Sequence, residues 1–300
     1  MLSSCVMSGL DELPARCVRK RSRTLARDVS AEGVGVFTGE KVTIRLLPAT
    51  EEKGIVFRRI DLPGKPLLPA HLDYVQGTPR CTVLGDRGVY IYTVEHLLAA
   101  LKAMDIHHAE VEISGSEVPI FDGSSLPFLE MLDLAGSCDL DGSVSQYSLL
   151  SPVFWSQGNI QIIALPSSEY RISYTLHYPQ APCIGTQFYS TRIHPEEFAR
   201  EIAPCRTFSI YEEVAPLIEK GLIRGGSLDS AVVIRDNRVA NPEGLRFSDE
   251  MVRHKILDLV GDLSLIPVDF LAHIVAIRSG HASNNAFAKE LFNHIQMENS

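Results

Sequence analysis

Three polar residues, spaced four apart, interrupt an apolar segment near the end of the chain. The segment EMVRHKILDLVGDL (250–263) carries most of its apolar residues at helical spacing, which is typical of a buried helix. His254, Asp258 and Asp262 would share nearly one face of that helix, because residues four apart stack along it. Burying an imidazole and two carboxylates without partners is costly, so this polar stripe requires a chemical explanation.

Metal binding is one explanation of the stripe. His254 and Asp258 can converge on one ion from a single helical turn, although a His–Asp pair on a helix is also a common surface interaction. A third ligand has to come from elsewhere, and His96 in TVEHLLAA (93–100) is the candidate. Two histidines and one carboxylate with an open position suit a catalytic zinc ion. The same set also suits non-haem iron.

The acid–base residues near these ligands distinguish the possible chemistries. A metal-dependent hydrolase needs a base for water and an acid for the leaving group. Glu95, next to His96, is the candidate base, and its alternative role is that of a solvated acid favoured by the helix dipole. His281 in RSGHASNN (278–285) is a second candidate, which Asp262 could hold protonated. The alternative for His281 is that it is an ordinary histidine at the beginning of a helix, without a catalytic role.

Two similar halves of the chain are predicted to position these residues. For the first half, alternation and β-branched residues predict strands at 24–37, 41–49, 54–61, 81–93 and 108–116, and helices at 94–106 and 126–136. Thr93 is the predicted N-cap of the helix at 94–106. For the second half we expect strands at 152–155, 159–164, 170–177 and 271–280, and helices near 195–202 and at 250–263 and 282–296. VEHLLAAL and VRHKILDL both place V-x-H at a helix start, which suggests two α+β units facing each other across a cleft.

The predicted domain boundary is the polar, Gly/Ser-rich stretch at 135–146. It separates a first domain at 22–140 from a second at 147–297. Residues 1–21 contain a basic run but no apolar stretch arranged as a secretory signal, and we expect a disordered N-terminal extension. An organellar presequence or a surface arm is the alternative for this extension.

The composition excludes several classes of protein. The chain is 45% hydrophobic and 22% charged, with a net charge of −9, which argues against general binding to nucleic acid. Six scattered cysteines without a C-x-x-C pair are typical of reduced thiols, so we expect a cytoplasmic protein without a disulfide framework. No apolar run approaches the ~18 residues of a membrane span. Nothing in the composition indicates an oligomeric state.

Seven short motifs occur in order along the chain: GVGVFTGEKVTIRLLPA, TVEHLLAA, EVPIFDGSSLPF, CRTF, GGSLDSAVV, VRHKILDLVGDL and RSGHASNN. With them the chain resembles the UDP-3-O-acyl-N-acetylglucosamine deacetylase family, the zinc amidases of bacterial lipid A synthesis, from about residue 22 to 297. The resemblance implies an α+β fold of two similar two-layer α/β sandwich domains, with helical layers packed between the sheets and the site at their junction. It also implies a β-α-β insert in the second domain at about 209–238, which forms an apolar passage for an acyl chain.

The resemblance also implies roles for the candidate residues. One zinc ion per chain would be held by His96, His254 and Asp258. Glu95 would be the general base, and His281, oriented by Asp262, would be the catalytic histidine. The Thr207 hydroxyl in CRTF would hydrogen-bond the oxyanion that forms from the amide carbonyl.

Further residues correspond to substrate contacts in the family. Lys255 and Arg278 are the expected cationic contacts, and Arg278 stands where relatives carry Lys, so its hydrogen-bond geometry differs. Phe208 follows Thr207 in the family pattern, and Tyr178 would stack on the uracil. The expected lining of the acyl passage is Tyr211, Val214 and Leu228, for which ordinary packing within the insert is the alternative.

The reaction implied is zinc-dependent hydrolysis of the N-acetyl group of UDP-3-O-acyl-N-acetylglucosamine. Its products are acetate and UDP-3-O-acyl-glucosamine, a committed step of lipid A biosynthesis. The amphiphilic substrate implies work near a membrane surface, without a transmembrane segment. Two alternatives remain open from the residues: another metal-dependent amidase or non-haem iron enzyme, and a non-catalytic nucleotide-sugar-binding protein.

Overall fold

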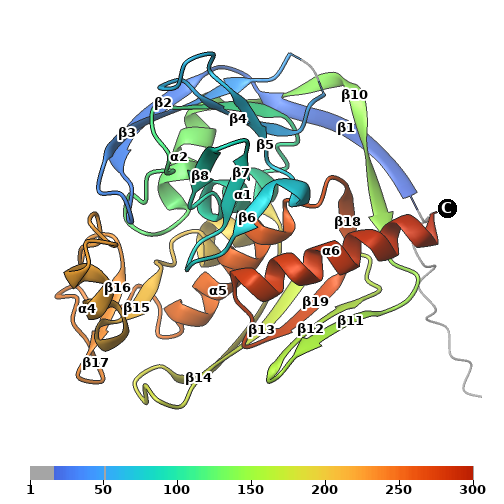
Figure 1. The fold of residues 1–300 in the computed structure, drawn as a ribbon. Helices are drawn as coiled ribbons and strands as arrows, with labels where there is room; N and C mark the ends of the chain where they lie inside the picture. The colour runs from blue at the N-terminus through green and yellow to red at the C-terminus, as the bar shows by residue number, and fades with distance from the viewer. Residues whose placement is uncertain (1–16, 51, 300) are drawn as a thin grey trace, which may run out of the picture.

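The structure is a computed structural model that describes residues 17–50 and 52–299. Two five-stranded sheets, with strand orders β2-β3-β9-β4-β5 and β11-β12-β19-β13-β14, form its outer layers (Figure 1). The first sheet consists of β2 (Val29–Val34), β3 (Lys41–Pro48), β9 (Ala109–Ile113), β4 (Ile55–Arg59) and β5 (Leu67–Pro69). The second consists of β11 (Val153–Gln157), β12 (Ile160–Leu165), β19 (His273–Ile277), β13 (Arg171–Tyr178) and β14 (Gly185–Arg192).

The two sheets have the same connectivity. In each sheet the strand that comes last in the chain occupies the centre, antiparallel to the second strand and parallel to the third. The outer pairs, β2–β3 with β4–β5 and β11–β12 with β13–β14, are antiparallel. This repetition confirms the prediction of two similar α+β units, which the sequence indicated only through the V-x-H pattern at the start of two helices.

Helices from both halves fill the space between the sheets (Figure 1). They are α1 (Glu95–Ala103), α2 (Leu126–Ala135), α5 (Glu250–Leu263) and α6 (His281–Glu298). α1 and α5 pack directly against each other, and their apolar side chains belong to a hydrophobic core shared with both sheets. The helices predicted at 94–106, 126–136, 250–263 and 282–296 are therefore present, and α5 begins and ends where its apolar periodicity does.

A small third sheet connects the two halves. It has the order β1-β10-β18, with β1 (Cys17–Leu25) antiparallel to β10 (Ser137–Ser148) and β10 parallel to β18 (Asp269–Leu271). The stretch predicted as the domain boundary, 135–146, thus lies mostly in a long strand. Residues 17–21, predicted as part of a disordered extension, form half of β1 because they pair with β10, so that part of the prediction is wrong. The rest of the predicted extension, residues 1–16, lies outside the described residues.

Shorter elements flank the helical layer. The first half contains the 3-10 turn η1 (Leu72–Tyr74) and a three-stranded sheet of β6 (Val75–Gly77), β7 (Val83–Asp86) and β8 (Val89–Tyr92). The helix predicted near 195–202 is a short α3 (Pro195–Glu197) followed by a π-helical turn, η2 (Phe198–Ile202). The insert consists of β15 (Phe208–Ile210), α4 (Tyr211–Glu219), β16 (Val232–Arg235) and β17 (Arg238–Val239). β15 and β16 are parallel and joined through α4, which is the predicted β-α-β arrangement.

Asp269 forms two ion pairs at the junction between the halves. This carboxylate contacts Lys102 on α1, and its other oxygen lies 2.5 Å from Lys20 Nζ on β1. Asp105 and His107 complete a second cluster of potential metal ligands here, but the Lys20 ammonium lies 2.5 Å from Asp105 as well and supplies the positive charge. Burial alone would raise the pKa of Asp269, but Lys102 and Lys20 outweigh it and hold the pKa well below its usual range.

The Asp269→Asn variant is expected to lose about 2 kcal/mol of unfolding free energy at pH 7, because the partly buried Lys102 ammonium loses its counter-charge and Lys20 keeps only that of Asp105. A depressed carboxylate pKa stabilises the fold above the pKa of the unfolded state, about 4, and this contribution is lost as the pH falls below it. Urea unfolding of both proteins at pH 7 and pH 3 should therefore show a difference that shrinks at pH 3. An equal difference at both pH values would contradict this account.

Candidate metal centre and active site

Three side chains from the two halves converge between the sheets. His96 is the second residue of α1, and His254 and Asp258 lie one turn apart on α5. Asp258 Oδ1 lies 3.2 Å from His254 Nε2 and 3.7 Å from His96 Nε2. All three residues are buried, and their ligand atoms lie within 4.8 Å of one another. The structure therefore brings together the three residues predicted as metal ligands.

The chemistry of this cluster fits a metal ion. Asp258 Oδ1 and His96 Nδ1 are buried without a hydrogen-bond partner among the described residues, although such atoms are normally paired. Burial and the neighbouring His254 lower the pKa of His96 to about 3, so its imidazole is neutral, which is the form that binds metals. His254 Nδ1 donates to the Cys205 carbonyl at 3.0 Å, so Nε2 is the ring nitrogen that faces Asp258 in the cluster.

A close approach of α1 and α5 makes the convergence possible. A Cβ atom on Gly261 would lie 2.1 Å from the carbonyl oxygen of Glu95, closer than a side chain can come. Glycine at this position lets the backbone of α5 lie against the first turn of α1. The apolar residues on the other faces of both helices are buried in the core, so the ligands are mounted on two rigid elements.

The acid–base candidates lie beside the cluster. His281 is the first residue of α6, and its Nδ1 forms a 2.9 Å hydrogen bond with Asp262 Oδ2. Its Nε2 lies 3.8 Å from Glu95 Oε1 and 4.0 Å from Asp258 Oδ2. The predicted pairing of His281 with Asp262 is therefore present, and the predicted base and acid face each other next to the potential ligands.

Burial and mutual charge perturb both groups. Burial, followed by the carboxylates of Asp262 and Asp258, raises the pKa of Glu95 to about 7 in spite of the nearby His281. Burial alone would lower the pKa of His281, but the carboxylates, led by Asp262, outweigh it and raise the pKa to about 9. At neutral pH the site thus holds a carboxyl group that can accept a proton and an imidazolium that can donate one.

Residues that the sequence analysis did not single out hold this pair. The Thr82 backbone N–H donates to Glu95 Oε2 at 3.1 Å, and its hydroxyl donates to Asp262 Oδ1 at 2.5 Å. Asn284 donates to the other oxygen of Asp262 at 2.8 Å, and Asn285 donates to the Thr82 hydroxyl at 3.2 Å. The two asparagines were visible only as members of RSGHASNN. Thr82 lies in an apolar strand-like run that carried no signal of such a role.

Thr93 has a different role from the predicted one. Val94 is the N-cap residue of α1 and no side chain caps this helix, so the prediction of Thr93 as N-cap is wrong. Thr93 adopts a left-handed backbone conformation (φ 60°), and its hydroxyl donates to Glu117 at 3.1 Å. Glu117 also accepts hydrogen bonds from the backbone of Phe37 and Thr38 in the glycine-rich hairpin. The hydroxyl therefore connects α1 to that hairpin instead of closing the first turn of the helix.

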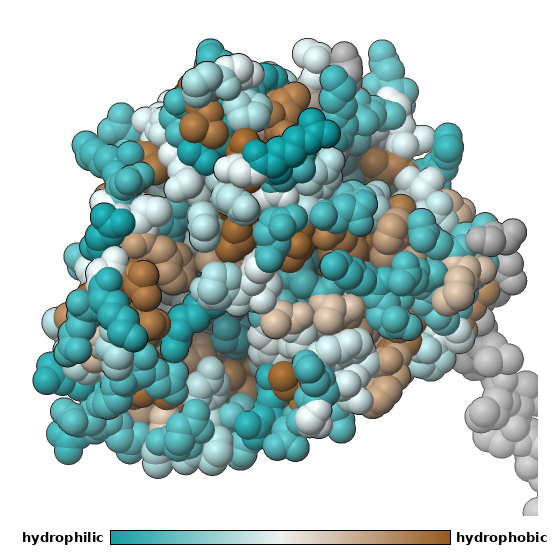
Figure 2. All heavy atoms as spheres, viewed as in Figure 1, coloured by the Kyte–Doolittle hydropathy of each residue, from teal (hydrophilic) through white to brown (hydrophobic). Residues whose placement is uncertain are grey.

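A cavity of about 290 Å³ extends from the cluster into the insert. Glu95, His96 and Thr207 line its polar part. Most of its apolar wall comes from the insert, and this part includes Phe208, Tyr211, Val214, Ile218, Leu228 and Val233. Over the insert, at the left of Figure 2, apolar side chains reach the surface among polar ones, and Ile218 and Leu228 are among the exposed apolar residues. The residues predicted for the oxyanion contact and the acyl passage thus line one continuous space.

The remaining predicted contacts lie outside the lining of that cavity. Lys255 Nζ is 2.6 Å from Asp258 Oδ2 and 5.5 Å from the centre of the Phe208 ring. Tyr178, at the end of β13, packs edge-to-face on the same ring with centroids 5.7 Å apart. Arg278 is exposed in a left-handed conformation (φ 59°), and its guanidinium has no hydrogen bond or ion pair within the described part of the chain. The structure therefore groups Lys255 and Tyr178 around Phe208 and leaves Arg278 apart.

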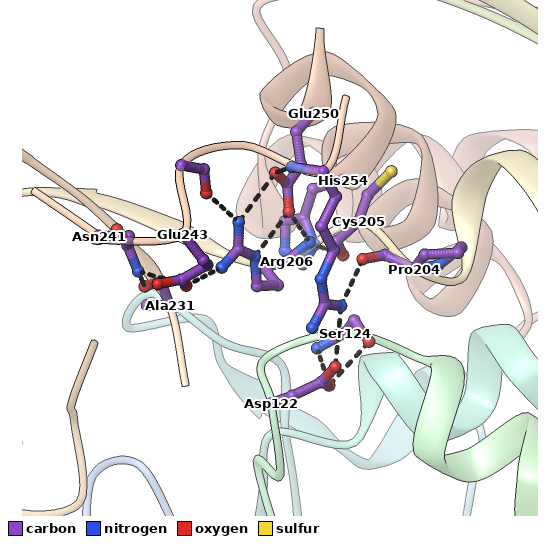
Figure 3. A network of polar contacts seen from close by, with 12 residues as sticks. Asp122, Ser124, Pro204, Cys205, Arg206, Ala231, Asn241, Glu243, Glu250 and His254 are labelled. Carbon is purple, nitrogen blue, oxygen red and sulfur yellow. Dashed lines mark hydrogen bonds and ion pairs between the residues drawn. The ribbon is translucent and has the colours of Figure 1, made fainter. Parts of the chain in front are cut away.

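A network centred on Arg206 supports the cluster from the side of the insert (Figure 3). Arg206 and Glu250 form a buried ion pair with Nε 2.8 Å from Oε1. Arg246 donates to the Pro204 carbonyl at 2.7 Å and lies 2.8 Å from Asp122 of the first half. Arg206 lies in CRTF and Glu250 in EMVRHKILDLVGDL, but neither motif indicated a role for its charged residue.

These features define a two-unit α+β protein with a candidate metal centre between its halves, next to the acid–base pair that a metal-dependent hydrolase requires. Among the described helices, none combines the length and apolarity needed to cross a membrane. Residues 22–293 match the family model described as UDP-3-O-acyl N-acetylglycosamine deacetylase. The chain belongs to this family of enzymes.

Relatives with curated names agree with this assignment. The chain is 48% identical over 281 residues to the UDP-3-O-acyl-N-acetylglucosamine deacetylase of Chlamydia pneumoniae, covering 93% of this chain and all of the relative. It is 46% identical to the protein of the same name from Chlamydia muridarum, over 93% of this chain and 97% of that one. For the Chlamydia trachomatis serovar D protein the identity is 44%, with the same coverage. The similarity therefore extends over both halves and the insert.

Proposed function

We propose that this enzyme hydrolyses the N-acetyl group of UDP-3-O-acyl-N-acetylglucosamine, giving acetate and UDP-3-O-acyl-glucosamine for lipid A synthesis. The observation that carries the proposal is the cavity that is lined at one end by His96 of the ligand cluster and at the other by the apolar insert. A substrate that carries an amide and an acyl chain on neighbouring carbons of one sugar fits such a space, with the amide near the cluster and the chain in the insert. The names of the relatives state the same substrate.

The metal proposed for the cluster is a single zinc ion, held by His96, His254 and Asp258. Two imidazoles and one carboxylate on rigid helices make up a donor set typical of catalytic zinc, which leaves a position open. When bound, zinc supplies a Lewis acid that polarises an amide carbonyl and lowers the pKa of water. Asp258 keeps its negative charge here, because His254 and Lys255 outweigh its burial and hold its pKa well below the usual range.

Proton transfer is assigned to Glu95 and His281. With a pKa of about 7, Glu95 is poised to take the proton of the attacking water near neutral pH. His281, with a pKa of about 9, is protonated and can stabilise the charge that develops on the carbonyl oxygen. The Thr207 hydroxyl is the proposed second donor to that oxygen. Either Glu95 or His281 then protonates the departing amine.

Substrate recognition is assigned to the insert and to the residues around Phe208. Tyr211, Val214 and Leu228 would contact the acyl chain, since they line the apolar part of the cavity. Phe208 and Lys255 would contact the sugar and its oxygens, Tyr178 would stack on the uracil, and the exposed Arg278 guanidinium would contact a phosphate. The proposed setting is the cytoplasm, where the enzyme meets its amphiphilic substrate near the membrane surface.

Acetate release tests this function directly. The protein loaded with zinc should release acetate from UDP-3-O-acyl-N-acetylglucosamine, and chelation followed by zinc readdition should abolish and restore the release. Substrates with graded acyl lengths would report how the cavity selects the chain. A protein that holds iron and releases no acetate would instead favour the non-haem iron alternative.

The Asp262→Asn variant should move the alkaline limit of activity to lower pH. The carboxylate of Asp262 makes the largest contribution that raises the pKa of His281 to about 9. Activity that needs protonated His281 is present below this pKa and lost above it, so removal of the charge should shift the limit down by about one to two pH units. The measurement is the pH profile of kcat, with Asp133→Asn on the exposed face of α2 as control. An unchanged alkaline limit in Asp262→Asn would argue against the proposed role of His281.

A further inference from the structure

One peptide unit beside the cluster is held at both ends by α5. The Cys205 carbonyl accepts the hydrogen bond of His254 Nδ1 at 3.0 Å, and the Arg206 N–H donates to Glu250 Oε1 at 3.0 Å (Figure 3). Both groups belong to the planar peptide bond between Cys205 and Arg206, so they point in opposite directions and cannot turn independently. Glu250 and His254 are one helical turn apart, and the peptide therefore bridges two successive turns of α5.

The side chains of Arg206 and Glu250 hold this peptide in place. Both are buried, with 2% and 0% of their side-chain surface exposed. The Arg206 guanidinium forms a two-pronged contact, with Nε 2.8 Å from Oε1 and an Nη atom 3.2 Å from Oε2. Glu250 also accepts the Arg246 N–H at 2.7 Å. Each charge is thus neutralised and hydrogen-bonded, which is the condition under which a buried ion pair persists.

The same guanidinium extends toward the wall of the substrate cavity. Arg206 donates to Glu243 at 2.5 Å and to the Gly244 carbonyl at 2.8 Å. Asn241 beside Glu243 donates to the carbonyls of Leu228 and Ala231 at 2.8 and 2.9 Å, and Leu228 lines the cavity. Arg206 therefore joins α5 to the segment that carries part of the apolar wall.

We infer that Arg206 and Glu250 are positioning residues, which fix the tautomer and ring orientation of His254 and the location of the adjacent Thr207. A carbonyl oxygen can only accept, so the Cys205 carbonyl requires the proton on Nδ1 and leaves Nε2 free as a ligand atom. The peptide that follows Arg206 carries the Thr207 N–H, which donates to the Gly123 carbonyl at 2.7 Å. This inference rests on the proposed function, because it assigns a task relative to a metal bound by His254.

Metal affinity and a metal spectrum test the inference without relying on activity. Arg206→Lys keeps the positive charge but removes the forked guanidinium. Glu250→Gln keeps the shape of the side chain but removes its negative charge. Both variants are expected to bind zinc about 10- to 100-fold more weakly, since partners of metal-bound histidines have effects of this size. The cobalt-substituted variants should show an altered visible absorption spectrum, which reports the geometry of the ligands. Both quantities are measured on the full chain after its secondary structure has been verified by circular dichroism.

Arg59→Lys is the matched control. Arg59 is also buried and forms a two-pronged ion pair, with Asp61, but it lies on β4 and has no contact with the cluster. This variant should lower thermal stability while leaving zinc affinity and the cobalt spectrum unchanged. The inference is overturned if Arg206→Lys and Glu250→Gln keep the affinity and spectrum of the unmodified protein, whatever happens to their stability. If the unmodified protein itself binds no zinc or releases no acetate, the proposed function fails instead, which is a separate outcome.

Discussion

The His96→Ala variant is expected to lose its bound metal and its turnover together. His96 is the ligand candidate contributed by the first half of the chain, and without it only the two α5 residues would remain at the cluster. Two ligands one turn apart on a single helix cannot complete the three-ligand set of a catalytic zinc site. We expect the zinc content to fall from about one ion per chain to near zero, and acetate release to fall by at least about 1000-fold. Elemental analysis and the acetate assay on the same preparation measure both effects.

The matched control for this variant is His108→Ala. His108 is also buried, but it does not belong to the cluster, and its Nδ1 accepts the Gly54 N–H at 2.9 Å. This substitution removes a buried imidazole and is expected to reduce stability while the zinc content remains unchanged. A folded His96→Ala protein that retained stoichiometric zinc would show that the ligand set is wrong.

The Glu95→Gln variant should separate metal binding from turnover. Glu95 does not belong to the ligand cluster, and glutamine has nearly the same shape, so we expect zinc to remain bound at about one ion per chain. The amide cannot take a proton from water, and loss of a general base typically lowers the rate by about 100- to 10,000-fold. The residual activity should also lack the acid limb near pH 7 that the raised pKa of Glu95 predicts for the unmodified enzyme.

A half-buried glutamate on the first sheet provides the control for this experiment. Glu110 on β9 forms an ion pair with Arg58, and Glu110→Gln should leave both zinc content and the pH profile unaltered. Full activity of Glu95→Gln would eliminate Glu95 as the base. Loss of zinc from Glu95→Gln would instead indicate that Glu95 supports the ligands, so the two roles are distinguishable.

Local patterns in the sequence were sufficient for the helices that carry the site. The apolar periodicity of 250–263 predicted α5 with its observed bounds, because apolar side chains that pack in a core recur every three to four residues along a helix. The spacing of His254, Asp258 and Asp262 also indicated a shared polar face, since it depends only on helical geometry. The order of the family motifs extended this to residues from separate segments, such as His281.

Non-local pairing decided what the sequence left open or predicted wrongly. Residues 17–21 form a strand instead of a disordered extension because β10, more than a hundred residues away, supplies their hydrogen-bond partners. Thr93 turns its hydroxyl to Glu117 instead of capping α1, because its backbone conformation is left-handed. In both places a long-range contact overrides the local preference of the residue.

The hydrogen bonds that hold the site residues in place were also decided by non-local contacts. Thr82 contacts Glu95 through its backbone N–H, and the Cys205 carbonyl accepts the hydrogen bond of His254. These backbone groups are the same in every residue except proline, which lacks the N–H. Residue type therefore carries no record of these contacts. The sequence by itself determined which side chains are the candidates for the chemistry and on which helical faces they lie. Only the tertiary structure decided which backbone groups and buried charges hold them in register, because those partners meet through packing and not through spacing along the chain.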